Sequence, residues 1–474
     1  VEEIERELLI NGKIPFTQAG SVSFQRIWKN DPEDMDDGDF RTDASGNQLA
    51  PSQIADPVFT SQYIRNTDSQ RVEPYYIALE AGENTIRLTG VRGGMTVRSL
   101  TLDIAPDITG VTYADYLAAH SGADYTGETL AIQGEAADRK SAPWLLPQTD
   151  RTSPATVPSH PTLMRLNTIG GSNWSSAGSW IEWTVDVPQA GFYSLGIKFR
   201  QNLVSGMFTT RTLYINGEIP FEAAAGLEFA YDGGWQGRVL ADSDGTAYKF
   251  YLEAGENTIR LEAAAGRAAE LFSRAEASVA ALNEAYRNII MLTSTSPDPL
   301  RNYRIDKVLP EVMETFRIQA GELQAISAGI AEISGEKGSI NTSLDNIQLQ
   351  LESFIEKPIT IPSRLETFKT NVSSLASWVY ELSSQPLEVD YLTLSAPEKG
   401  TDVSEVTDVD AGFWAKLVFE VQAFIGSYTA DYSMLSSTAE GSVSIDLWVN
   451  SGRDQATIIK RLADSRFTPQ TGIP

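Results

Sequence analysis

Ten consecutive residues occur twice in this chain. The sequence LEAGENTIRL at positions 79–88 recurs without a change at positions 252–261. Upstream of each copy stands a second matched segment, LINGKIPF at 9–16 and YINGEIPF at 214–221. Ten identical residues do not arise by chance, so the chain contains two copies of one module, separated by loops of unequal length.

The matched segments and their neighbours are typical of β-strands. Apolar and polar residues alternate through 180–187, and a Pro-Gln-Ala-Gly turn leads into the apolar segment 192–199. Asn-Gly follows an apolar run in both copies, which is a tight-turn signal because both residues accept a positive φ at low cost. Short strands separated by Gly, Asn and Pro turns predict a β-sandwich of the jelly-roll type.

The second copy is interrupted by a helical insertion. Segments 95–106 and 386–397 share Leu-Thr-Leu and Ala-Pro, which predicts the same closing strand in both modules. About 120 residues intervene in the second copy only, and their apolar spacing of three and four predicts a bundle of four helices. The predicted helices cover 267–293, 303–334, 338–356 and 362–383.

These patterns divide the chain into four parts, and a resemblance described below implies a fifth, the beginning of an α/β domain at 442–474. The four parts are a first sandwich (1–107), a second sandwich (128–265 plus 386–397), the inserted bundle (267–384) and a linker helix region (405–437). The first sandwich lacks its N-terminal half, because only eight residues precede Leu9 whereas about 85 precede Leu213 in the second. We expect either upstream sequence or self-association by strand addition to supply that half.

Composition excludes several classes of function. A net charge of −26 opposes binding to nucleic acid, whose affinity depends on neutralising phosphates. The chain has no Cys, two His and no run of 18 apolar residues, so neither thiolate metal sites nor a membrane-spanning segment is expected. No nucleophile, P-loop or paired zinc motif is present. We therefore expect a non-enzymatic, extracellular protein at the cell surface.

Two Gly-flanked loops of the second sandwich carry candidate sugar-binding residues. Aromatic faces stack on the apolar CH faces of sugars, while Asn and Asp bond the hydroxyl groups. The alternative is that the tryptophans belong to the sandwich core. The candidates are Asn173 and Trp174 in the first loop and Tyr231, Asp232 and Trp235 in the second.

The second sandwich resembles carbohydrate-binding modules of families 35 and 6. The similar segments are 132–137 (IQGEAA), 180–183 (WIEW), 190–193 (AGFY), 213–217 (LYING) and 387–391 (LEVDY). The resemblance implies a structural calcium ion held by a Glu-x-Glu pair near the first strand and an Asp in the last strand. Here Gln133 stands in the first of these positions, and Glu135 and Asp390 fill the others. The implied calcium site therefore has one carboxylate fewer.

The C-terminal residues resemble a different family. Segments 443–459 and 467–473 are similar to the opening strand and helix of family 1 extracellular solute-binding proteins, which serve ABC importers of sugars. This resemblance implies an oligo- or polysaccharide ligand and an ABC permease as partner, and it favours a large solute-binding protein of a Gram-positive bacterium. The alternatives are a structural or assembly protein of the cell surface, acting as a stalk or polymerising subunit, and an accessory module of a glycoside hydrolase.

Overall fold

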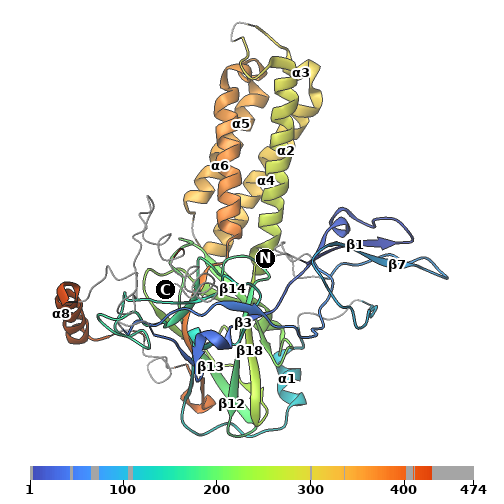
Figure 1. The fold of residues 1–474 in the computed structure, drawn as a ribbon. Coiled ribbons are helices and arrows are strands. Elements are labelled where there is room, and N and C mark those ends of the chain that lie inside the picture. The colour runs from blue at the N-terminus through green and yellow to red at the C-terminus, as the bar shows by residue number, and fades with distance from the viewer. Residues whose placement is uncertain are drawn as a thin grey trace, which may run out of the picture.

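The computed structural model describes residues 4–42, 46–65, 74–104, 110–298, 301–335, 337–401, 409, 411–429 and 459. A β-sandwich lies at the centre, a helical bundle rises from one of its ends, and a small N-terminal sheet projects to the side (Figure 1). The predicted fold class, antiparallel sandwich strands with an inserted helical bundle, is confirmed.

The duplicated segments form equivalent strand pairs. In the first copy β1 (Ile4–Ile10) pairs antiparallel with β7 (Ile86–Arg92), and in the second β14 (Phe208–Ile215) pairs with β18 (Gly255–Ala264). Asn11 Nδ2 donates to Asn84 Oδ1 at 2.9 Å, and Asn216 Nδ2 donates to Asn257 Oδ1 at the same distance. Both Asn11 and Asn216 have φ of 52°, as tight turns require. The two copies therefore share backbone geometry and turn contacts as well as sequence.

Two sheets form the second sandwich around one apolar core, which contains the fully buried ring of Trp183. The helix α1 (Tyr113–Ala119) packs Tyr116 against this core. One sheet has the order β15 (Leu227–Ala230), β14, β18, β12 (Trp180–Val187), β9 (Arg139–Lys140), β3 (Trp28–Asn30), β6 (Gln53–Ala55). The other sheet has the order β10 (Pro147–Gln148), β11 (Thr168–Gly171), β19 (Leu387–Ser395), β13 (Gly191–Arg200), β16 (Gln236–Val239). In this second sheet β8 (Leu130–Gln133) also pairs with β19, and β17 (Phe250–Leu252) also pairs with β13.

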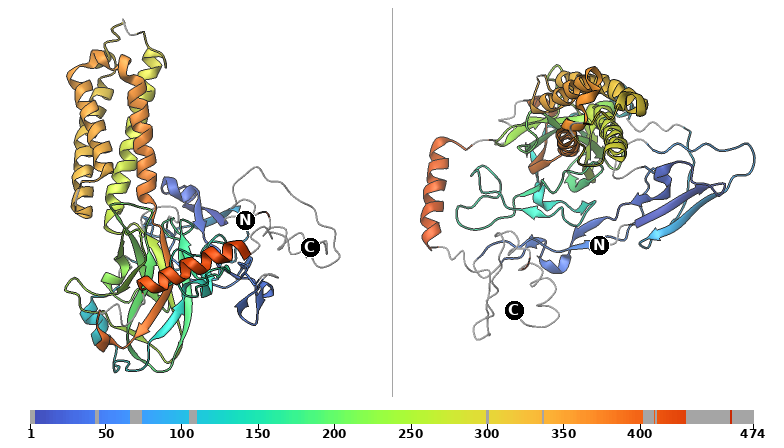
Figure 2. Two further views of the ribbon diagram at one scale, coloured as in Figure 1. Left: turned by 90° about the vertical axis from the view of Figure 1, so that its left-hand side faces the viewer. Right: turned by 90° about the horizontal axis from the view of Figure 1, so that it is seen from above.

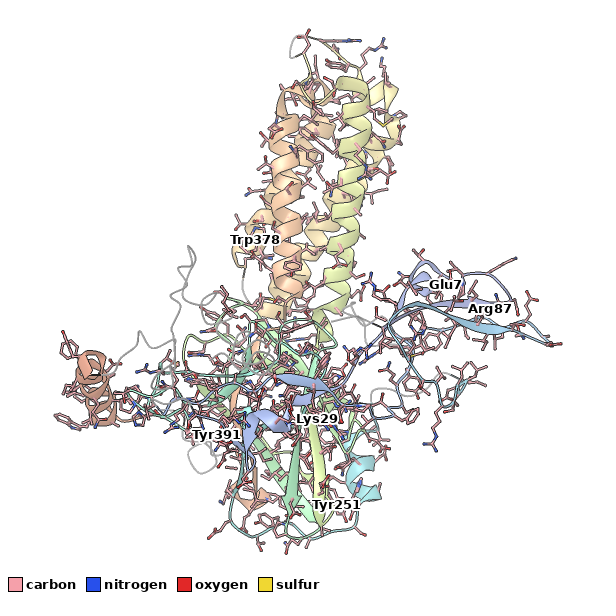
Figure 3. All side chains as sticks on the ribbon, in the orientation of Figure 1. Glu7, Lys29, Arg87, Tyr251, Trp378 and Tyr391 are labelled. Carbon is pink, nitrogen blue, oxygen red and sulfur yellow. The ribbon has the colours of Figure 1, made fainter. Side chains whose placement is uncertain are left out.

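Two strands from the N-terminal region belong to the second sandwich. The sequence analysis assigned β3 and β6 to the first module, whereas both extend the sheet of the second one beyond β9. Lys140 accounts for the difference, because its buried ammonium donates to Asn30 Oδ1 at 2.6 Å and to Gln53 Oε1 at 3.1 Å. Lys29, labelled in Figure 3, adds an ion pair with Asp56 at 2.9 Å. The strands β3 and β6 of the N-terminal region therefore form the edge of one sheet of the second sandwich.

The first module is smaller than predicted. Its sheet has the order β2 (Val22–Phe24), β1, β7, and a small core contains Leu8, Ile10 and Val22. Segment 95–104 is not a strand, so the prediction of a second closing strand there is wrong. Leu102 is 55 % exposed, whereas its counterpart Leu394 in β19 is 1 % exposed. The exposure differs because β19 lies between β11 and β13 in its sheet, whereas no described residue pairs with segment 95–104.

Four long helices form the insertion between β18 and β19, with a short helix α3 (Ile305–Val308) at the far end (Figure 1). The bundle's apolar faces share one core, in which the rings of Phe316, Phe354 and Phe368 meet at 5.5–5.7 Å between centroids. Seen from the side, the bundle stands upright on the sandwich, and seen from above its helices are viewed nearly end-on (Figure 2). The long helices are α2 (Ala269–Thr293), α4 (Pro310–Ser334), α5 (Ser339–Glu356) and α6 (Leu365–Ser383).

We expect the second sandwich to fold without the bundle. Both ends of the insertion meet at Thr210, which pairs with Ala264 of β18 and donates its N–H to Gln385 Oε1 at 2.8 Å. A short linker can therefore replace residues 268–384 at little entropic cost. Circular dichroism of this deletion protein should show β structure and a cooperative melt. Loss of both would mean that the sandwich needs the bundle.

The C-terminal part of the described chain is the helix α8 (Phe413–Thr429), within the predicted linker helix region. In Figure 2 it lies in front of the sandwich in the left view and at the edge of the molecule in the right view, and it exposes several large apolar side chains, including Trp414 and Phe424. In the part of the chain that the structure describes, no helix has the length and apolar character to cross a membrane. The predicted beginning of a solute-binding domain at 442–474 lies outside the described residues, apart from residue 459.

Candidate functional site

A rigid aromatic loop lies at the end of the sandwich from which the bundle rises. It connects β15 to β16 and contains Tyr231, Asp232 and Trp235. Asp232 donates its N–H to Gln201 O at 2.9 Å and accepts the N–H of Gly234 on Oδ1 at 2.8 Å, so the turn is fixed at both ends. Tyr231 and Asp232 are exposed and Trp235 is half-buried. The loop therefore presents aromatic and carboxylate groups to solvent on a defined backbone.

Arg200 holds the indole of Trp235 in place. The guanidinium carbon lies 4.7 Å from the centroid of the indole ring, and Trp235 Nε1 donates to Asp150 Oδ2 at 3.1 Å. Arg200 Nη2 donates to Asp150 Oδ1 at 3.0 Å and to Glu388 Oε2 at 2.6 Å, while Nη1 donates to Thr152 Oγ1 at 2.8 Å. Burial lowers the pKa of Arg200, but the carboxylates of Glu388 and Asp150 together outweigh it and raise that pKa above its ordinary value. The charged network fixes the ring before any ligand arrives, which lowers the entropic cost of binding.

The sequence analysis did not predict Arg200, Asp150 and Glu388 as site residues. They lie far apart along the chain, and the register Arg200↔Glu388 between β13 and β19 brings two of them together. The detectable signal was Arg200 itself, a charged residue at the end of a strand that is otherwise almost fully buried.

Trp174 belongs to the core and not to the surface. Its side chain is fully buried, and Nε1 donates to Ser179 O at 3.0 Å. The guanidinium carbon of Arg211 lies 4.2 Å from the ring centroid and covers one face of the indole. The prediction that this ring faces a sugar is therefore wrong, and the alternative of a core residue holds. A buried face cannot stack on a ligand.

Asn173 and the aromatic loop occupy the same end of the sandwich. Asn173 is exposed beside the start of β19, where Gly171 pairs with Leu387, and Glu388 follows at once beside Arg200. The structure thus brings Tyr231, Asp232 and Trp235 together in one loop and places Asn173 in a separate loop at that end. Asn173 stays a predicted sugar contact.

The three residues implied for calcium lie in the interior near the first and last strands of the second sandwich. Gln133 pairs with Tyr391 across β8 and β19, next to Asp390. Gln133 Oε1, Glu135 Oε2 and Asp390 Oδ2 are buried without a geometrically good hydrogen bond, although Lys198 Nζ lies 2.9 Å from Asp390 Oδ2 as an ion pair. Burial raises the pKa of Glu135 to about 8, and the charge of Asp390 adds to the rise. Burial also raises the pKa of Asp390 to about 6, against the opposing effect of Lys198.

The chemistry of this donor set does not fit calcium. Calcium takes six to eight oxygen ligands and favours ionised carboxylates. Gln133 is a neutral amide, and Asp390 Oδ2 is already paired with Lys198 Nζ at 2.9 Å. Nowhere in the described ranges do three His, Cys, Asp or Glu side chains gather in a way that could hold a metal ion.

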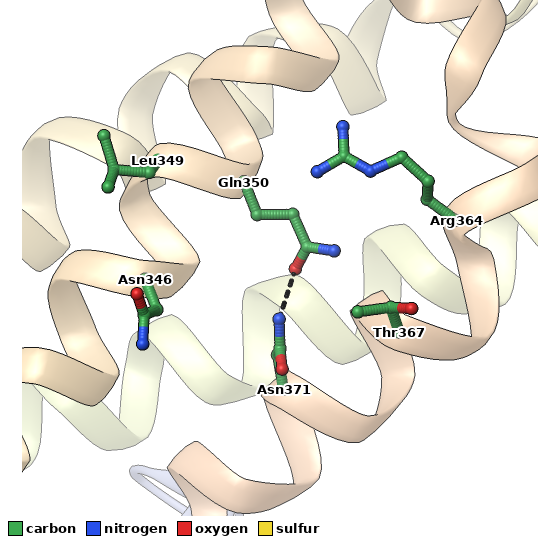
Figure 4. A pocket seen from close by; sticks show the side chains of 6 residues that line it. All are labelled: Asn346, Leu349, Gln350, Arg364, Thr367 and Asn371. Carbon is green, nitrogen blue, oxygen red and sulfur yellow. Dashed lines mark hydrogen bonds between the residues drawn. The ribbon is translucent and has the colours of Figure 1, made fainter.

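A polar groove also lies on the bundle, between α5 and α6 (Figure 4). Gln350 Oε1 accepts a hydrogen bond from Asn371 Nδ2 at 2.9 Å within it. Arg364 is held at one side by Ser353 Oγ at 2.7 Å and by the ring of Phe354. The groove carries no carboxylate and no aromatic face. It is therefore a weaker candidate for a sugar site than the loop at Tyr231–Trp235.

Comparisons with known proteins find solved structures and one family model that are similar to part of the chain. Among the structures are a family 35 carbohydrate-binding module from Clostridium thermocellum (18% identity, 29% of this chain and 87% of that chain, TM-score 0.21) and one from Cellvibrio japonicus (18%, 29% and 82%, 0.19). A third is a cycloisomaltooligosaccharide glucanotransferase from a Paenibacillus species (20%, 31% and 17%, 0.20). No curated protein sequence matches the chain. Residues 270–385, the inserted bundle, match the family model of the four-helix bundle domain of bacterial solute-binding proteins.

Proposed function

We propose that this chain recognises a saccharide through the second sandwich and acts as a non-catalytic part of a bacterial sugar-binding protein at the cell surface. The observation that carries the proposal is the preorganised loop at Tyr231–Trp235, where Arg200 and Asp150 hold one aromatic ring in place and an exposed tyrosine and carboxylate lie beside it. Aromatic faces next to polar groups are what a sugar requires from its site.

The family match of the bundle supports the wider setting. A four-helix bundle domain of bacterial solute-binding proteins at 270–385 favours a role in solute capture, and the net charge of −26 suits a solvated surface protein. In this setting the full-length protein delivers sugar to an ABC permease. An oligo- or polysaccharide suits this loop as a ligand, because Tyr231 and Asp232 are exposed to solvent.

Replacing Tyr231 with alanine should weaken glycan binding by about 1–3 kcal/mol, the range expected for one stacked aromatic contact. Trp235→Ala should cost at least as much, because it also removes the ring beneath Arg200. Isothermal titration calorimetry with an oligosaccharide that the parent protein binds measures the loss of binding free energy in both variants. Tyr380→Ala is the matched control, because Tyr380 is an exposed tyrosine on the bundle. Parental affinity in the Tyr231 and Trp235 variants would exclude this loop as the sugar site.

A further inference from the structure

A lysine ammonium contacts Asp390, one of the three residues that the family resemblance implies for a metal ion. Lys198 belongs to β13, and its side chain is fully buried. Nζ lies 2.9 Å from Asp390 Oδ2, also fully buried, and donates a hydrogen bond to the carbonyl of Ala155. The ring of Tyr391, labelled in Figure 3, has its centroid 5.3 Å from Nζ. The ammonium is thus surrounded by one carboxylate, one carbonyl and one aromatic face.

A β-bulge places the carboxylate. Lys198 pairs with Tyr391 and Phe199 pairs with Val389, so Asp390 is the extra residue of the bulge between β13 and β19. Its side chain turns inward, where Oδ1 accepts the N–H of Val157 at 3.2 Å. The ion pair therefore joins three pieces of chain: the two central strands and the segment that contains Ala155 and Val157.

That segment begins at the candidate sugar site. Asp150, five residues before Ala155, accepts hydrogen bonds from Arg200 and Trp235. A cation that fixes the segment also helps to fix the aromatic loop. In many binding proteins a calcium ion supplies such a cross-link, because it binds several oxygen atoms from different parts of the chain.

A calcium ion and Lys198 compete for the same carboxylate. To bind Asp390 Oδ2, calcium would have to displace an ammonium that is fully buried. A displaced ammonium that stayed buried would lose its counter-charge, which is strongly unfavourable. The neutral amide of Gln133 offers calcium no charge in compensation.

We propose that the ammonium of Lys198 replaces a bound metal ion in the second sandwich, so that this module folds and holds residues 150–157 in place without calcium. The proposal concerns the interior of the sandwich and does not depend on whether the module binds sugar. Its measurements are calcium binding and thermal stability, so its failure is distinguishable from a failure of the proposed function.

Calcium titration of the whole chain tests the proposal directly. After treatment with EDTA, isothermal titration should show no saturable binding up to about 5 mM calcium, beyond the affinity range of extracellular calcium modules. The melting temperature should change by less than about 1 °C between EDTA and calcium, since a ligand that does not bind the native state cannot stabilise it. Saturable binding of one equivalent that Asp390→Asn abolishes would overturn the proposal.

Substitution of the lysine tests the same idea from the other side. Lys198→Met should melt at a lower temperature than the parent, because the buried carboxylate of Asp390 loses its counter-charge. Lys369→Met, on the exposed face of α6, is the matched control and should melt like the parent. A Lys198→Met protein that melts like the parent would contradict the proposal.

A double variant covers the case in which Lys198→Met does not fold. Lys198→Met with Asp390→Asn removes both charges, so it should fold and melt at the same temperature with and without calcium. Stabilisation of this double variant by calcium would show that the metal binds elsewhere in the module, and the proposal would fall.

Discussion

Trp174→Ala is expected to lower the free energy of unfolding of the second sandwich by about 3–5 kcal/mol, the cost of deleting a large aromatic side chain from a core. The indole is fully buried and makes a hydrogen bond to Ser179 O at 3.0 Å. Its loss also removes the ring beneath the guanidinium of Arg211, which is itself fully buried. Urea denaturation, followed by intrinsic fluorescence of the remaining tryptophans, measures the change.

The neighbouring residue provides the control for this prediction. Asn173 is exposed, so Asn173→Ala should change stability by less than about 0.5 kcal/mol. Under conditions where the Trp174→Ala protein is folded, this protein should bind glycan with the affinity of the parent. If the Trp174→Ala protein melted like the parent but had lost glycan binding, Trp174 would be a residue of the sugar site after all.

Phe316→Ala is expected to destabilise the bundle by about 3–5 kcal/mol and to leave the sandwich intact. Phe316 is fully buried, and its ring meets those of Phe354 and Phe368 at 5.7 and 5.5 Å between centroids. The bundle core and the sandwich core are separate clusters, so the cavity affects the helices first. The helical circular dichroism signal should be lost at a lower urea concentration than in the parent.

An exposed residue of the same helix serves as the control for the bundle. Ile318 is 58 % exposed on α4, so Ile318→Ala should leave the helical transition close to that of the parent. If Phe316→Ala also lowered the stability of the β structure by the same amount, the two parts would unfold as one unit. That result would contradict the independence on which the deletion of residues 268–384 depends.

The sequence predicted the elements whose signals are local. The exact repeat marked equivalent strands, and apolar residues at spacings of three and four marked the four long helices. The strand at 95–104 failed because a closing strand forms only where neighbours pair with it, and sequence pattern does not report neighbours. The placement of β3 and β6 failed for a related reason: Lys140 binds Asn30 and Gln53 from far away in sequence.

The candidate site shows the same division. Gly-rich turns marked the segment Tyr231–Trp235 as a loop, which it is in the structure, because their backbone requirements are local. They also marked Trp174, whose ring turns inward beneath Arg211. Exposure depends on packing between strands, so a loop motif alone could not separate the two tryptophans. Lys198 gave a signal that the prediction did not use: a lysine inside a strand that is otherwise apolar has to find a buried partner.

A glycan array with the whole chain tests the central claim, that this protein recognises a saccharide, most directly. We expect the parent protein to retain at least one class of oligo- or polysaccharide, and the Tyr231→Ala and Trp235→Ala proteins to show a reduced signal on the same glycans. Retention of no glycan by a protein whose circular dichroism shows folded sandwich and bundle would contradict the claim.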